Sequence, residues 1–144
     1  KKTVVAVAKD KAFCFYYEDN LNLLKKLGAE IQYFSPIHDR NLPEGTCAVY
    51  LGGGYPELYA KALEENETIR NEIRRKAEED MPILAECGGY LYLLKELEDE
   101  NGTGYEMAGV FSGKGYEKFS FRLYYGTDRK GQSVFKSRRD HQRP

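Results

Sequence analysis

The chain has 144 residues, a formal net charge of −1 and three cysteines. This length suits one domain with a sizeable core, and the charge balance gives no reason to expect nucleic acid or a membrane surface as a partner. No apolar run approaches the roughly 20 residues of a membrane span. The cysteines lack the paired spacing of a disulfide framework or a zinc site, so we expect a cytoplasmic protein without a metal centre.

Four short segments predict β-strands. Each is apolar or rich in β-branched residues, and most are followed by glycine, proline or polar positions. They are residues 3–8, 30–34, 47–51 and 82–86. The first has the continuous apolar pattern of a strand that is buried on both faces.

A helical pattern follows the first strand. The predicted helix is capped by Asp19 or Asn20 and is stopped by Gly28. The side chains expected on its inner face are those of Leu21, Leu24 and Leu27.

Three further helices are expected along the chain. One covers residues 56–63, and a charged one covers residues 68–79 with Ile69 and Ile73 facing inward. The last covers residues 90–97 and follows the fourth strand. Strands and helices in repeated alternation are typical of an α/β fold, in which a mostly parallel sheet is covered by helices on both faces.

The pattern changes after Asn101. Residues 107–111 and 119–125 predict strands in an antiparallel arrangement. Residues 128–144 are polar, basic and poor in core residues, so we expect a mobile, solvated tail rather than a nucleic-acid patch. The sequence thus predicts one α/β domain over residues 1–127 and a flexible tail after it.

Ligand sites in parallel sheets form beyond the carboxyl ends of the strands. Three informative segments follow predicted strands, namely residues 10–17, residues 52–57 and Cys87. We therefore expect them to meet at one edge of the sheet. In the first segment, the aromatic residues suit a pocket wall or a domain contact, core packing is the alternative for Phe13 and Phe15, and these alternatives stay open.

Cys87 is the candidate nucleophile. An apolar strand stops at this cysteine, Gly88 and Gly89 follow, and an apolar segment of helical length begins, as in a strand–turn–helix unit that carries a nucleophile. The helix places free N–H groups beside the sulfur and favours the thiolate, which is the reactive form. The alternative is a buried structural cysteine at a strand end, and the paired glycines argue against it.

A cysteine nucleophile also needs groups that stabilise the oxyanion. The N–H groups of Gly88 and of Gly53 or Gly54 are the candidate donors, because they follow neighbouring strands. The alternative for the glycine run is a flexible turn that binds nothing.

No catalytic base is convincingly placed in the sequence. His38 follows the second strand and is expected on the surface, and His141 lies in the polar tail. Glu86 directly precedes Cys87, so its side chain should point to the opposite face of the strand and act as a structural partner for a nearby backbone group.

Three motifs, taken in order, together resemble one known family. Residues 6–20 look like its opening signature, residues 50–58 like its glycine turn and residues 85–89 like its nucleophile turn. Residues 107–114 also resemble the strand that follows. The family is the glutamine amidotransferase domain of cobyrinate a,c-diamide synthase, and the match covers about residues 3–114.

This resemblance implies a flavodoxin-like, class-I amidotransferase fold in which Cys87 attacks the side-chain amide of glutamine and ammonia is released. It implies an N-terminal synthase domain in the same parent enzyme, which would use ATP and Mg²⁺ to amidate carboxylates of a corrin precursor in cobalamin biosynthesis. No cofactor is implied for this chain itself, and a homodimer is an open alternative.

The chain departs from the family in one respect. The family's histidine lies in a Gly-His-Glu-Phe-His-like motif well after the cysteine, whereas Gly115-Tyr116-Glu117 is followed by Lys118 and Phe119. We therefore expect a domain that is truncated or divergent at its C-terminus. As an isolated chain it should be a poor glutaminase.

Several alternatives follow from that departure. The domain could bind a partner or product without hydrolysing glutamine, or it could belong to an enzyme that amidates hydrogenobyrinate or nickel-sirohydrochlorin. A different cysteine hydrolase or stress protein with a similar turn is disfavoured by residues 15–20 (Phe-Tyr-Tyr-Glu-Asp-Asn), which fit the diamide synthase pattern.

Overall fold

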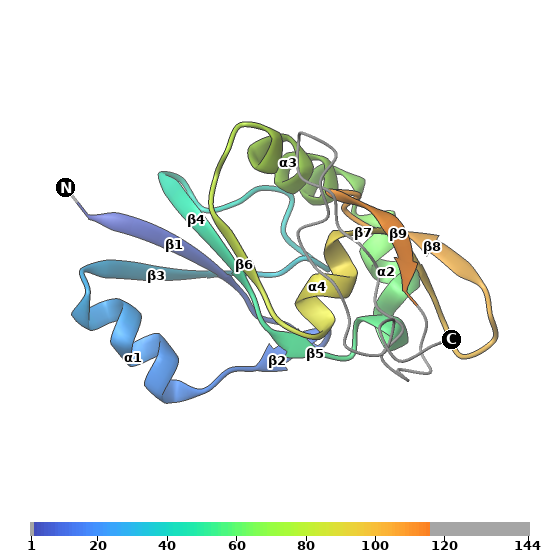
Figure 1. Ribbon diagram of the computed structural model, residues 1–144, viewed down its shortest axis with the longest axis horizontal. Helices are drawn as coiled ribbons and strands as arrows, with labels where there is room; N and C mark the ends of the chain where they lie inside the picture. Colours follow the sequence, from blue (N-terminus) through green and yellow to red (C-terminus); the bar gives the residue numbers. More distant parts are fainter. Residues whose placement is uncertain (1, 116–144) are drawn as a thin grey trace, which may run out of the picture.

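The computed structural model describes residues 2–115, and its centre is a four-stranded parallel sheet (Figure 1). The strand predicted over residues 119–125 and the tail predicted over residues 128–144 lie outside this range. All four strands predicted before them are confirmed, and the α/β class with them. In the order β3-β1-β4-β6 across the sheet, they are β1 (Thr3–Ala8), β3 (Ala29–Phe34), β4 (Thr46–Leu51) and β6 (Ile83–Ala85).

A small antiparallel ribbon lies where β1 and β4 end (Figure 1). It pairs β2 (Phe13–Phe15) with β5 (Gly53–Gly54), and Phe15 is opposite Gly53 in the register. The two glycines are therefore residues of a paired strand rather than of a free loop. The ribbon brings the segment after β1 into contact with the segment after β4.

The first helix, α1 (Glu18–Lys26), begins earlier than predicted. Tyr17 precedes it as the cap residue, so the prediction that Asp19 or Asn20 caps this helix is wrong. No side chain makes a capping hydrogen bond at the start of this helix. The acidic side chains in its first turn instead interact favourably with the positive end of the helix dipole. Leu27 is 76% exposed because the helix ends before it, so the prediction that its side chain lies on the inner face is wrong.

The chain between β5 and β6 forms three helical pieces. A 3-10 helix, η1 (Pro56–Tyr59), runs into α2 (Ala60–Glu65), so the helix predicted to open at the proline has a tighter first half. The next helix is α3 (Glu67–Glu78), close to its predicted bounds. Ile69 and Ile73 are fully buried on its inner face, as predicted from their spacing.

The fourth predicted helix is shorter than the sequence suggests. α4 spans Gly88–Leu93, and the chain then forms β7 (Leu94–Glu98), so the prediction of a helix over residues 90–97 is wrong for its second half. Leu94 and Leu97 are fully buried, and their spacing of three residues is that of a helix face. The strand forms because it pairs with partners on both sides, and such tertiary pairing overrides local propensity.

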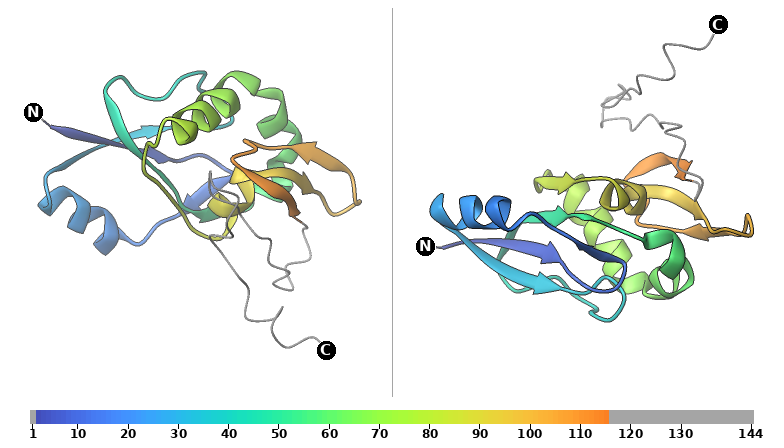
Figure 2. Two further views of the ribbon diagram at one scale, coloured as in Figure 1. Left: turned by 45° about the horizontal axis from the view of Figure 1, so that its top comes forward. Right: turned by 90° about the horizontal axis from the view of Figure 1, so that it is seen from below.

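Those partners are β8 (Gly104–Glu106) and β9 (Phe111–Gly115), in the order β8-β7-β9. The prediction of a strand over residues 107–111 is therefore wrong for most of its length. Gly109 has a φ of +69° and donates its N–H to the Leu94 carbonyl at 3.0 Å, so this apolar run is a turn packed on β7. The three-stranded sheet lies at the end of the molecule opposite α1 (Figures 1 and 2).

Two apolar cores lie on opposite faces of the parallel sheet. The larger one joins the sheet to α2, α3, α4 and β7, and the smaller one is covered by α1. Alternate residues of each strand enter different cores, as the two-residue period of a strand requires. The larger core includes Ala6, Val49, Leu51, Leu63 and Tyr92, and the smaller one includes Val5, Val7, Leu21 and Tyr50. The prediction of helices on both faces is thus confirmed.

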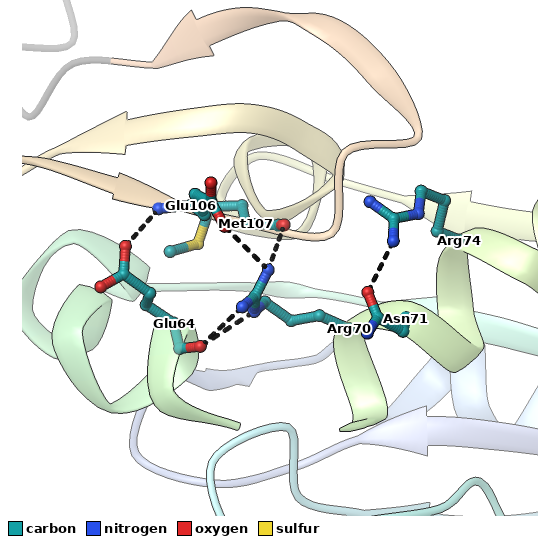
Figure 3. A network of polar contacts seen from close by, with 6 residues as sticks. All are labelled: Glu64, Arg70, Asn71, Arg74, Glu106 and Met107. Carbon is teal, nitrogen blue, oxygen red and sulfur yellow. Dashed lines mark hydrogen bonds and ion pairs between the residues drawn. The ribbon is translucent and has the colours of Figure 1, made fainter. Parts of the chain in front are cut away.

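One buried arginine fastens the helices to the three-stranded sheet (Figure 3). Arg70 of α3 is 6% exposed; its Nε and Nη2 atoms donate to the Glu64 carbonyl at 3.0 and 2.8 Å, and Nη1 donates to the Met107 carbonyl at 3.1 Å. The Glu106 N–H donates to the Glu64 carboxylate at 2.7 Å. This network holds the segment after β8 against the end of α2.

Candidate active site

Cys87 lies at a sharp turn between β6 and α4. Its φ of +48° and ψ of −112° are unusual for a residue with a side chain, and the side chain is exposed. The Glu86 N–H donates to the Leu51 carbonyl at 2.9 Å, and the Gly89 N–H donates to the Glu86 carbonyl at 2.8 Å. The predicted strand–turn–helix is confirmed, and the alternative of a buried structural cysteine is wrong.

The glycines after Cys87 are required because backbones approach closely there. A Cβ at Gly89 would overlap the carbonyl of Leu51, and a Cβ at Gly88 would lie 2.8 Å from Pro56 Cδ. The same Cβ at Gly88 would be 3.2 Å from the backbone nitrogen of Gly54. The start of α4 is therefore packed directly on the glycine ribbon.

The structure brings the predicted donors to the nucleophile. A Cβ placed on Gly53 would lie 3.8 Å from Cys87 Cβ. The N–H groups of Tyr90 and Leu91 both donate to the Cys87 carbonyl, whereas the Gly88 N–H has no acceptor within residues 2–115. At least one predicted donor is thus unengaged beside the thiol. The roles of these glycines in stabilising an oxyanion stay predictions.

Of the residues considered as bases, His38 and Glu86 lie in the described part of the chain. His38 is exposed in the turn after β3, where its backbone N–H donates to Ser35 Oγ at 3.0 Å. His141 lies outside the described residues. Glu86 accepts a hydrogen bond from the Tyr50 hydroxyl at 2.8 Å, so it serves a structural purpose, though its partner is a side chain.

Asp10 organises the loop after β1, a role that the sequence analysis missed. One carboxylate oxygen accepts the N–H groups of Ala12 and Phe13 at 2.8 and 3.2 Å. The other oxygen accepts the Ser35 hydroxyl at 2.8 Å and the Ile37 N–H at 3.0 Å. Asp10 therefore ties the loop after β1 to the loop after β3. Its position directly after a buried strand was the available signal.

The two phenylalanines in that loop have different environments. Phe13 is fully buried and meets the Tyr92 ring edge-on, with 5.4 Å between centroids. Phe15 is 53% exposed and meets the Tyr55 ring at 5.2 Å, and it is also the nearest side chain to a Cβ at Gly53. Core packing is therefore correct for Phe13, whereas Phe15 lies beside Gly53, the glycine next to Cys87 in space.

The sequence analysis also missed the roles of two tyrosines that lie next to the site, Tyr16 and Tyr50. The Tyr16 hydroxyl donates to the Ala8 carbonyl and accepts the Gly52 N–H at 3.0 Å. The rings of Tyr16 and Tyr50 meet edge-on, with 5.2 Å between centroids. Burial, assisted by the hydrogen bond to Glu86, raises the pKa of Tyr50 to about 12, so its hydroxyl stays protonated near neutral pH. The sequence showed only that tyrosine is abundant.

Residues 2–115 contain no group of three or more His, Cys, Asp or Glu side chains arranged to hold a metal ion. No helix in the same part of the chain has the length and apolar character needed to cross a membrane.

Sequence comparisons show similarity to glutamine amidotransferases. A family model described as the CobB/CobQ-like glutamine amidotransferase domain matches residues 4–119. The cobyrinate a,c-diamide synthase of Caldanaerobacter subterraneus subsp. tengcongensis is 49% identical over 111 residues, which are 77% of this chain and 25% of that protein. The synthase of the same name from Clostridium acetobutylicum is 44% identical over 121 residues, or 84% of this chain and 28% of that protein.

A third relative, the cobyrinate a,c-diamide synthase of Listeria innocua, is 50% identical over 109 residues, covering 76% of this chain and 24% of its own length. The chain therefore spans about a quarter of the length of these curated relatives. The family model, in contrast, matches well over half of the chain, including the whole ribbon and the turn at Cys87. The chain belongs to the CobB/CobQ-like glutamine amidotransferase domain family.

Proposed function

We propose that this chain is the glutamine-hydrolysing domain of a cobyrinate a,c-diamide synthase. The observation that carries the proposal is the exposed Cys87 thiol on a strained turn, with Gly53 and the unengaged Gly88 N–H beside it. This arrangement supplies a nucleophile and nearby donors for a carbonyl oxygen, which acyl transfer requires. The names of the relatives supply the substrate class.

In the proposed reaction, Cys87 Sγ attacks the carbonyl carbon of the glutamine side-chain amide. The oxygen becomes negatively charged, and the N–H groups of Gly88 and of Gly53 or Gly54 stabilise it. The carbon–nitrogen bond then breaks, the nitrogen takes up a proton and leaves as ammonia, and a glutamyl thioester remains. Water hydrolyses the thioester to glutamate and restores the thiol.

The ammonia would be used elsewhere in the parent enzyme. The relatives are about four times as long as the matched part of this chain, because that part covers 24–28% of them. We propose that a preceding synthase domain activates carboxylates of a corrin precursor with ATP and Mg²⁺ and receives the ammonia, in cobalamin biosynthesis. The free state of all three cysteines supports a cytoplasmic setting.

A chloroketone analogue of glutamine tests the glutaminase assignment. The thiolate of Cys87 should add to the ketone carbonyl, whose oxygen becomes an oxyanion, and the sulfur should then displace chloride to leave one covalent adduct with the ketone restored, which intact-mass spectrometry detects. Cys14 and Cys47 are also exposed, so they provide internal controls within the same chain. We expect Cys87→Ser to abolish the adduct and Cys14→Ser to leave it unchanged.

Glutamine itself provides the specificity control. An excess of glutamine should slow the labelling of Cys87, whereas glutamate or asparagine should not. A folded wild-type chain that forms no adduct, or an adduct distributed over all three cysteines, would contradict the assignment. Circular dichroism of each sample shows whether the protein is folded.

A further inference from the structure

In the loop between β2 and α1, the side chain of Tyr16 lies against Gly52, in the glycine turn between β4 and β5. The Tyr16 hydroxyl donates to the Ala8 carbonyl, at the end of β1, and accepts the Gly52 N–H at 3.0 Å, just after β4. Two adjacent strands of the sheet are thus joined at their carboxyl ends by one phenol. The Gly52 N–H has no other acceptor within residues 2–115.

The ring of Tyr16 also fills the space below this turn. A Cβ on Gly52 would overlap Tyr16 Cε1 and would lie 2.6 Å from Cζ and 2.9 Å from the Phe15 carbonyl oxygen. The backbone at Gly52 is therefore in contact with the ring as well as with the hydroxyl. A turn held by both contacts has little freedom to move relative to β1.

A second tyrosine connects this turn to the nucleophile. The Tyr16 ring meets the Tyr50 ring edge-on at 5.2 Å, and the Tyr50 hydroxyl donates to the Glu86 carboxylate at 2.8 Å. Glu86 is the residue before Cys87. Tyr16 therefore contacts the backbone of the glycine turn, and Tyr50 contacts the side chain of the residue before Cys87.

We infer that Tyr16 is a positioning residue for the oxyanion donors: its hydroxyl fixes Gly52 and thereby sets the N–H groups of Gly53 and Gly54 relative to Cys87. This inference rests on the proposed glutaminase function. Tyr16 touches neither the thiol nor a substrate, so it acts only through the glycine turn. Burial raises the pKa of its hydroxyl above the ordinary value, which keeps the proton needed for the bond to Ala8.

The variant Tyr16→Phe removes the hydroxyl and keeps the ring. Loss of an oxyanion donor costs about 100-fold to 1,000-fold in rate, so a donor that is only displaced should cost less, roughly tenfold. We expect the maximal rate of Cys87 labelling by the glutamine chloroketone to fall about tenfold, with little change in the concentration that gives half-maximal rate. Labelling by iodoacetamide, which forms no oxyanion, should stay at the wild-type rate.

Two matched variants separate positioning from general destabilisation. Ile73→Val weakens the core on α3, far from the turn, and should lower thermal stability without changing the ketone-labelling rate. Tyr17→Phe removes the hydroxyl of an exposed neighbour and should behave as wild type. Equal loss of ketone labelling in Tyr16→Phe and Ile73→Val would overturn the inference, as would an unchanged rate in Tyr16→Phe.

The outcome with the wild-type chain distinguishes this inference from the proposed function. Failure of the wild-type chain to react with the chloroketone overturns both, whereas wild-type labelling with an equally fast Tyr16→Phe overturns only the role of Tyr16. If Tyr16→Phe does not fold, a measurement on the wild-type chain still tests the inference. Amide hydrogen exchange of the wild-type chain should show the Gly52 N–H strongly protected, and exchange at the rate of a free amide would overturn the inference.

Discussion

At φ +48° and ψ −112°, the backbone of Cys87 costs about 1–3 kcal/mol relative to an ordinary conformation. Hydrogen bonds on each side offset this cost, since Glu86 is bonded to Leu51 and Gly89 to Glu86. The strain has a geometric consequence. It turns the side chain out of the strand direction, so that the thiol is exposed beside the glycine ribbon and not buried in the sheet.

Adjacent glycines in that ribbon should respond very differently to substitution. A Cβ at Gly53 meets Phe15 Cβ and Cys87 Cβ at 3.5 and 3.8 Å, which are ordinary contacts, whereas a Cβ at Gly54 would overlap the Ala12 carbonyl. We expect Gly54→Ala to lower the free energy of unfolding by about 1–3 kcal/mol. Gly53→Ala should fold normally and lower the ketone-labelling rate of Cys87 roughly tenfold, which corresponds to about 1.4 kcal/mol.

Urea unfolding and ketone labelling of both variants measure these effects separately. The two positions are next to each other in one strand, so each serves as the control for the other. Gly53→Ala with wild-type labelling would mean that substrate does not enter between the ribbon and Cys87. A fully stable Gly54→Ala would mean that the ribbon is looser than its contact with Ala12 indicates.

At the scale of elements, the sequence predicts best where one pattern has one explanation. The strands of the parallel sheet and the inward face of α3 follow from local periodicity, and so does the turn at Cys87. The region from Leu94 onward does not, because the three-residue spacing of Leu94 and Leu97 favours a helix face, whereas these residues form a strand. Only the pairing of β7 with β8 and β9 selects the strand, and those contacts are distant in sequence.

Prediction of the site from the sequence is limited in the same way, by contacts between residues that are distant in sequence. Gly53, Gly54 and Gly88 could be predicted as neighbours of Cys87, because parallel strands end at one edge. The roles of Tyr16 and Asp10 could not, since each depends on which carbonyl or N–H group lies within reach after folding. Hydrogen bonds of this kind leave no periodic signal in the sequence.

Arg70 should be the side chain on which the attachment of the three-stranded sheet depends. It is 6% exposed and satisfies the carbonyls of Glu64 and Met107, which would be left without this donor in Arg70→Ala. We expect this variant to lower the free energy of unfolding by about 2–4 kcal/mol. Arg70→Lys should recover little, because one ammonium cannot span both carbonyls as the planar guanidinium does.

The neighbouring Arg74 is the matched control for that experiment. It lies one turn further along α3, is exposed, and donates to Asn71 Oδ1 at 2.6 Å (Figure 3). Arg74→Ala should change the free energy of unfolding by less than about 0.5 kcal/mol. Urea unfolding of the three variants gives the comparison, and an Arg70→Ala variant as stable as Arg74→Ala would contradict the assigned role.

At the scale of the whole molecule, three tyrosines with raised pKa values lie in or against the two cores. Tyr16 and Tyr50 belong to the core under α1, and Tyr92 belongs to the larger core on the opposite face of the sheet. Burial is the main cause that raises the pKa of all three above the ordinary tyrosine value. The Tyr92 hydroxyl has no hydrogen-bond partner within residues 2–115, so it contributes a cost without a compensating bond.

These tyrosines predict a specific loss of stability in alkali. In the unfolded chain they ionise near pH 10, whereas in the folded chain they keep their protons to higher pH, to about 12 for Tyr50. Above about pH 10 the unfolded state therefore binds fewer protons than the folded state, and the free energy of unfolding falls as pH rises. The stabilisation is complete below about pH 10 and is lost as pH approaches the folded-state values.

The variant Tyr92→Phe isolates one contribution to this pH dependence. It removes a buried hydroxyl that has no partner within residues 2–115, so we expect unchanged or higher stability at pH 7. Above about pH 10 its free energy of unfolding should decline less steeply than that of the wild type, because one fewer tyrosine ionises on unfolding. Urea titrations at a series of pH values measure both slopes. Ile73→Val, which changes no titratable group, should be less stable and show the wild-type slope; parallel curves for Tyr92→Phe and the wild type would exclude burial of Tyr92 as a source of the alkaline instability.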